Sequence, residues 1–124
     1  MGLLSFFRRN KKQRYIVDKT QIDREFVENR FQFLVDSGYK YKYYQKYSER
    51  EFIYTLNDCR VEVFLNSYVF DCVIQTNGFP RSNITQNPLV DSFFKDRFFK
   101  ATNIQRIDMV VTLLYENAEI FLLK

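Results

Sequence analysis

Apolar residues recur at intervals of three and four in the first third of the chain, a period typical of an amphipathic helix. The pattern covers residues 21–37, and its apolar side consists of five residues: Ile22, Phe26, Val27, Phe33 and Leu34. Thr20, with Asp23 three residues later, predicts the cap at the helix start. Gly38 supplies the left-handed residue that commonly ends a helix. We therefore expect one helix with one buried side.

From residue 39 the period changes to two, which is typical of β-strands. Strands are predicted near residues 39–43, 51–56, 61–66 and 68–74. The turn sequences Asn57-Asp58 and Asn66-Ser67 separate the later strands. Four successive strands with short connections predict an antiparallel meander. Residues 76–86 are expected to form a loop.

The helical period returns after this loop. Asn87 and Pro88 predict a capped helix start, followed by an apolar helix over residues 89–99. The clearest pattern covers residues 104–121, where six apolar residues share one side: Ile104, Ile107, Val111, Leu114, Ala118 and Phe121. The predicted order is α-β-β-β-β-α-α, an α+β fold in which the helices pack on one face of a four-stranded antiparallel sheet.

A chain of 124 residues is long enough for one domain with a buried core. Aromatic residues make up 19% of it, so large rings must fill much of that core. We expect residues 1–15 to form a basic amphipathic leader and residues 16–124 to form a single α+β domain. No apolar run approaches the roughly 20 residues that a membrane-spanning helix needs.

The net charge of +4 is concentrated in the leader. Five bases and no acid lie there: Arg8, Arg9, Lys11, Lys12 and Arg14. The rest of the chain carries 14 basic and 15 acidic residues. A general nucleic-acid-binding body is therefore disfavoured. Apolar residues beside the leader's bases leave open a weak contact with an anionic membrane.

The residue types needed for catalysis are scarce. The chain has no His, the commonest general base and metal ligand, and no glycine-rich phosphate loop. Cys59 and Cys72 are expected to be free thiols of a cytoplasmic protein. Glu62 is expected directly opposite Asp71, as a pair of solvated acids rather than a catalytic pair. We therefore expect no enzyme, no cofactor and no metal site.

The outward face of the predicted sheet mixes apolar and charged residues, and such patches often bind a protein. Its candidate partner-binding residues are Glu51, Ile53, Glu62, Phe64, Val69 and Asp71. The alternative, which the sequence leaves equally open, is that the phenylalanine-rich helix or the leader covers this face.

Lysines and tyrosines alternate along the first predicted strand. Such a strand can stack on bases and neutralise phosphates. The interpretation we favour is that the tyrosines pack inward and the lysines protect a sheet edge. The residues for the alternative contact with nucleic acid or an anionic membrane are Arg8, Arg9, Lys11, Lys12, Lys40, Lys42 and Lys46.

The segment 31–39 resembles the F-x-x-L-x-x-x-G-[FY] helix exit of small bacterial immunity proteins of polymorphic and contact-dependent toxin systems. The tyrosine-bearing strand and the closing helix fit this pattern, and the resemblance covers residues 22–124. It implies a non-catalytic inhibitor that occludes one toxin. Because such surfaces vary with the toxin, the resemblance transfers no binding residue. The leading hypothesis is a cytoplasmic protein-binding module.

Overall fold

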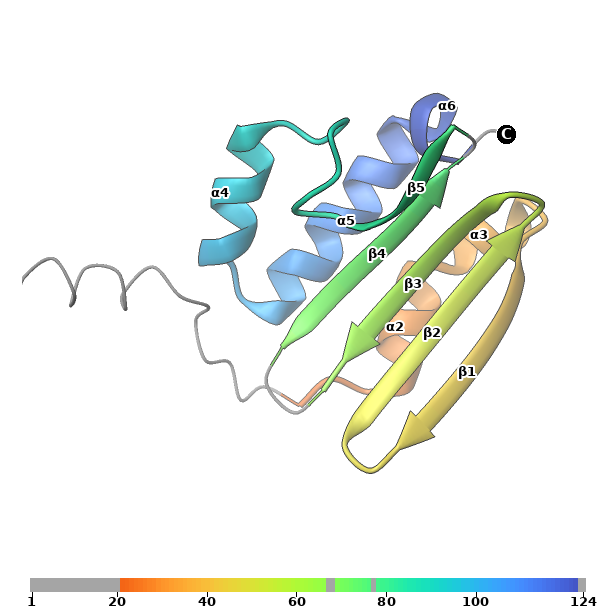
Figure 1. The fold of residues 1–124 in the computed structure, drawn as a ribbon. Coiled ribbons are helices and arrows are strands. Elements are labelled where there is room, and N and C mark those ends of the chain that lie inside the picture. The colour runs from red at the N-terminus through yellow and green to blue at the C-terminus, as the bar shows by residue number, and fades with distance from the viewer. Residues whose placement is uncertain (1–20, 67–68, 77, 123–124) are drawn as a thin grey trace, which may run out of the picture.

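The computed structural model describes residues 21–66, 69–76 and 78–122, which fold into one antiparallel sheet with helices on one side (Figure 1). The fold is α+β, as the sequence predicts. The elements are α2 (Arg24–Arg30), α3 (Gln32–Asp36), β1 (Lys40–Lys46), β2 (Glu49–Leu56), β3 (Cys59–Leu65), β4 (Phe70–Thr76), β5 (Phe79–Asn83), α4 (Ser92–Lys100), α5 (Asn103–Glu116) and α6 (Ala118–Phe121). The strands lie in the sheet in chain order.

The two faces of the sheet follow the alternation in the sequence. The inner face, which packs against the helices, carries buried residues that include Phe52, Tyr54, Val61, Val63, Cys72 and Ile74. Helices α5 and α6 contact β4, and α2 contacts α5 (Figure 1). The opposite side, called the outer face below, carries Glu51, Phe64 and Asp71. None of the described helices crosses it (Figure 1).

The first helical segment is interrupted, so the expectation of one continuous helix is wrong. Helix α2 ends at Arg30, and the backbone at Phe31 leaves the helical range with ψ 10°. The Phe31 ring is fully buried and stacks on Tyr54 with 5.8 Å between ring centroids. We attribute the bend to the packing of this ring. Asp23 occupies the N-cap position without a side-chain capping hydrogen bond, whereas Thr20 lies outside the described residues.

Gly38 ends this segment as the sequence predicts. Its φ of +104° lies in the left-handed region, which favours glycine. The Gly38 N–H donates to the Val35 carbonyl and the Tyr39 N–H donates to the Leu34 carbonyl, both at 3.0 Å. This pair of bonds is a Schellman motif, and it directs the chain into β1.

A fifth strand forms where the sequence analysis places a loop. Strand β5 pairs antiparallel with β4, and Thr76 lies opposite Phe79. Only two residues therefore connect the strands, and the second, Gly78, has φ +96°. Asn-Gly is a strong hairpin signal, but Pro80 favours a loop because proline cannot donate a ladder hydrogen bond. At the edge of the sheet this loss is tolerated.

The β3–β4 register also differs from the expectation. Leu65 pairs with Phe70, so four residues rather than two connect these strands. The Asn66 side chain stabilises the turn by accepting from the Val69 N–H at 2.8 Å. The longer turn shifts the register by two residues. Glu62 consequently lies opposite Val73, not Asp71, and the expected carboxylate pair does not form.

Helix α4 begins later than expected. Its cap is Asp91, whose side chain accepts from the Phe94 N–H at 2.8 Å. Asn87 instead closes a turn, because its side chain accepts from the Leu89 N–H at 2.8 Å. Asparagine favours both caps and turns, and Pro88 is compatible with either.

The last helical segment is divided at Asn117 into α5 and α6. Thr102 and Gln105 form a capping box at the start of α5. The buried side consists of Asn103, Arg106, Ile107, Val110 and Leu114. Ile104 and Val111 are therefore less buried than expected. Arg106 lies on the buried side instead and donates to the carbonyls of Phe98, Phe99 and Phe70.

Candidate functional site

The outer face places Phe64 between two acidic residues. Glu51 on β2 pairs with Phe64 on β3, and Phe64 pairs with Asp71 on β4. Side chains in directly opposite positions share a face and contact each other. The Phe64 side chain is half-buried. The strands β2, β3 and β4 thus form a row of carboxylate, aromatic ring and carboxylate near the β3–β4 turn.

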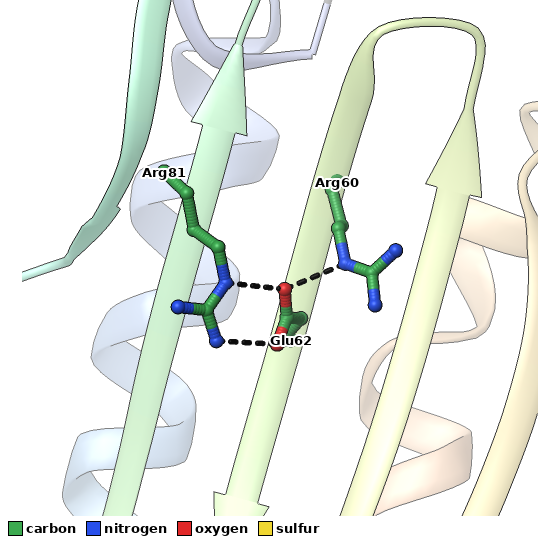
Figure 2. Close-up of polar contacts among 3 residues, drawn as sticks. All are labelled: Arg60, Glu62 and Arg81. Atoms are coloured by element: carbon green, nitrogen blue, oxygen red, sulfur yellow. Dashed lines mark hydrogen bonds and ion pairs between the residues drawn. The ribbon is translucent and has the colours of Figure 1, made fainter.

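The next row contains a buried glutamate. Glu62 is only 4% exposed, although its strand position points away from the core. Figure 2 shows the reason: Arg81 Nε and Nη2 donate to the two Glu62 carboxylate oxygens at 2.8 and 2.9 Å, and Arg60 Nε donates at 2.6 Å. The expectation of a solvated surface acid is wrong for Glu62.

These contacts fix the ionisation of Glu62. The hydrogen bonds from Arg81 lower its pKa from the ordinary value; burial opposes this effect, and the bond from Arg60 adds to it. A carboxylate held charged by two guanidinium groups is a poor proton donor. Its observed role is to join β3 to β5.

A hollow of about 250 Å³ opens beside Phe64. Its walls are Glu49, Arg50, Glu51, Phe64, Leu65, Asn66, Val69 and Asp71. A neighbouring hollow of about 450 Å³ is lined by Tyr44, Gln45, Lys46, Glu49 and Glu51. The two hollows share Glu49 and Glu51, so they lie side by side. We call the hollow beside Phe64 the acidic hollow, because three carboxylates and one guanidinium line it.

Asp71 is held in place within this hollow. One carboxylate oxygen accepts from the Asn83 side-chain amide at 2.8 Å, and the other accepts from the Cys72 N–H at 2.9 Å. Both donors are neutral, so the negative charge of Asp71 is oriented but not compensated by them.

The charge of the outer face changes sign along the strands. Lys40, Arg60 and Arg81 lie toward one end, where β2 turns into β3, and Lys42 is next to them. The acidic hollow lies toward the other end, near the turn between β3 and β4. The apolar residues Ile53 and Val73 lie between.

The six residues predicted for partner binding all line this surface. Ile53, Phe64 and Asp71 are half-buried, Glu62 is covered by its arginines, and Val69 and Glu51 form walls of the hollow. Glu49 and Arg81 also belong to this surface and are not among the residues predicted from the sequence. Glu49 was missed because β2 begins earlier than predicted, and Arg81 because β5 was taken for a loop.

Two tyrosines of β1, Tyr41 and Tyr43, lie on the face opposite its lysines, whereas Tyr44 is 51% exposed on the lysine side. Lys40, Lys42 and Lys46 are exposed. Tyr41 stacks on Tyr54 at 4.8 Å and Tyr43 packs against Phe52 at 5.0 Å between ring centroids. The inward packing of these tyrosines is confirmed. Arg8, Arg9, Lys11 and Lys12 lie outside the described residues.

The two cysteines are buried free thiols. Burial raises the pKa of the Cys72 thiol well above its usual value, with nearby Asp71 and Glu62 adding to the shift. Cys72 is therefore kept as an unreactive thiol.

Among the residues that the structure describes, no group of three potential metal ligands occurs. Within the same residues, no helix is long and apolar enough to cross a membrane.

A different hollow, of about 630 Å³, lies between α4 and α5. Arg97 and Lys100 of α4 line it together with Asp108 and Glu116 of α5. Because both charge signs are present in equal number there, these residues give no preference for the charge of a ligand.

Comparison of the chain with models of protein families, with curated proteins and with solved structures finds no match.

Proposed function

We propose that this chain is a non-catalytic protein-binding module that docks through the outer face of its sheet. The observation that supports this proposal is the position of Phe64, a half-buried aromatic ring on the central strand β3, near the β3–β4 turn, on a face that no described helix crosses. Large aromatic rings at the centre of an interface are typical binding hot spots. The charged residues around Phe64 match the polar rim of such interfaces.

The specific role that we propose is immunity: a cytoplasmic protein that neutralises a bacterial toxin by occluding it. The support is the resemblance of residues 31–39 to the helix exit of small immunity proteins, together with a five-stranded sheet of which one face is crossed by no described helix. Such an inhibitor needs surface complementarity rather than reactive groups. The two thiols are buried and Glu62 is held by two arginines, so none of these groups is available as a reactive group.

Binding through Phe64 is tested by affinity capture from the native host with the wild type and two variants. Phe64→Asp should reduce the captured partner at least about 30-fold, because it replaces a hot-spot ring by a charge. Phe93→Asp is the matched control, since Phe93 is 69% exposed and belongs to α4, a helix that does not cross the outer face (Figure 1). Equal capture by both variants would contradict the proposal.

The immunity role has its own test. The captured protein, identified by mass spectrometry, should arrest growth when it is expressed alone. Co-expression of the wild-type chain should restore growth, and co-expression of Phe64→Asp should not. A partner that leaves growth unchanged would leave a binding module but overturn the immunity assignment.

A second candidate function is contact with nucleic acid or an anionic membrane through the leader and β1. The exposure of Lys40, Lys42 and Lys46 favours it. The packing of Tyr41 and Tyr43 against the core disfavours it, because these rings are not free to stack on bases. Truncation of the chain before residue 15 should abolish salt-sensitive binding of this kind and leave the protein complex intact. Loss of the protein complex on truncation would favour this second function.

A further inference from the structure

The carboxylates of the outer face differ in whether the chain itself neutralises them. Glu62 forms ion pairs with Arg60 and Arg81. Among the residues that the structure describes, Glu49, Glu51 and Asp71 form no ion pair within 4.0 Å. The end around Phe64 therefore carries three carboxylates, with Arg50 in the same lining and Lys46 opposite Glu49, and the other end carries two partly exposed guanidinium groups. A protein that docks here must present positive charge to the acidic end and negative charge to the basic end.

The acidic end of the outer face is also concave. Phe64 forms a wall of the hollow of about 250 Å³, and the pairings of β2, β3 and β4 place Glu51 and Asp71 on either side of its ring. Directly opposite residues on neighbouring strands lie about 5 Å apart, so the two acidic positions are about 10 Å apart across the ring. A cation placed on the Phe64 ring would lie between them.

An arginine that lies on an aromatic ring and beside a carboxylate already occurs elsewhere in the molecule. The Arg24 guanidinium lies 3.8 Å from the centroid of the Tyr43 ring and forms an ion pair with Glu28 at 2.8 Å. An arginine between an aromatic face and a carboxylate gains both cation–π attraction and a charge-assisted hydrogen bond. The acidic hollow offers a ring and carboxylates in a similar combination.

We propose that the partner protein inserts an arginine side chain into the acidic hollow, onto the Phe64 ring and between Glu51 and Asp71. This inference rests on the proposed function, since it assumes that the outer face binds a protein. Arginine fits better than lysine because its planar guanidinium stacks on a ring and donates to carboxylates in a fixed geometry. Lys40, Arg60 and Arg81 repel a basic group at the opposite end, so the charges also set the orientation of the partner.

The test uses a defined probe instead of the natural partner. The peptide acetyl-Gly-Arg-Gly-Arg-Gly-amide is titrated into the full chain labelled with ¹⁵N, and backbone amide shifts are followed by NMR. We expect saturable shifts, weak and sensitive to salt, centred on Glu51, Phe64 and Asp71. The same peptide with citrulline in place of arginine keeps the shape without the charge, and it should bind at least about fivefold more weakly.

Variants locate the binding site. Glu49→Gln together with Glu51→Gln should weaken binding of the arginine peptide at least about fivefold. Glu116→Gln is the matched control, because Glu116 is an exposed acid on α5; it should have no effect. Equal binding of the citrulline peptide, unchanged binding by the double variant, or the lack of any saturable shift would each overturn the proposal.

The two proposals fail in different ways. If Phe64→Asp loses the partner but the arginine peptide does not bind, the outer face is an interface and the arginine anchor is wrong. If the peptide binds at the hollow but Phe64→Asp captures the partner normally, the arginine site exists and the proposed docking face is wrong.

Discussion

The two faces of the sheet place neighbouring phenylalanines in opposite situations. Phe52 on β2 is fully buried and packs against Tyr43 on the inner face. Phe64 on β3 belongs to the outer face and remains half-buried between Glu51 and Asp71. Both residues occupy strands with the same period-two pattern. The difference shows that alternation assigns side chains to faces, whereas the elements that pack on each face decide how deeply they are buried.

The largest expected effect is on the inner face. Phe52→Ala should lower the free energy of unfolding by about 3–5 kcal/mol, because it removes a fully buried ring and leaves a cavity. Phe93→Ala, at an exposed position of α4, is the control and should change stability by less than about 0.5 kcal/mol. Urea unfolding followed by circular dichroism measures both. Equal effects of the two substitutions would contradict the assignment of the inner face.

Much of this division is predictable from the sequence. The alternation in β2, β3 and β4 places Phe52, Val63 and Cys72 on one side and Phe64 and Asp71 on the other, as observed. The end of the first helical segment at Gly38 is also predictable, because it depends on the local backbone conformation. A left-handed residue is needed there, and glycine adopts that conformation without a steric penalty.

The remaining features depend on contacts between segments that are distant in sequence. The burial of Glu62 follows from Arg81, which reaches it only because β5 pairs with β4. The hollow beside Phe64 depends on the four-residue turn that shifts the β3–β4 register. The Asn-Gly sequence before β5 is a usable signal, but Pro80 outweighs it when the chain is read locally. The candidate face was thus predictable, and its charge arrangement was not.

The next effect concerns the ion pairs that cross the outer face. Glu62→Gln should cost about 1–2 kcal/mol at neutral pH, because the arginine partners are substantially exposed and water screens them. The pKa of Glu62 is lowered in the folded chain, so its ionised form stabilises the fold above the pKa of the unfolded state. That contribution is lost as the pH falls through the folded-state pKa.

The pH dependence provides the measurement. Urea unfolding of the wild type and Glu62→Gln should show a gap that is constant near pH 7 and shrinks below about pH 5. Glu116→Gln, at an exposed position, serves as the control and should show a much smaller gap. A gap for Glu62→Gln that persists unchanged to pH 3 would mean that packing, not charge, explains its cost.

The smallest expected effect is on the ring that distinguishes the outer face. Phe64→Ala should lower the free energy of unfolding by less than about 1 kcal/mol, since the side chain is half-buried and its removal leaves no enclosed cavity. The same substitution should weaken partner binding strongly if the ring is the interface centre. Urea unfolding and affinity capture on one protein sample therefore separate the two roles of a phenylalanine. A loss of stability as large as that of Phe52→Ala would instead show that Phe64 belongs to a covered core. The outer face would then not be a docking surface, and the arginine site proposed on it would be excluded as well.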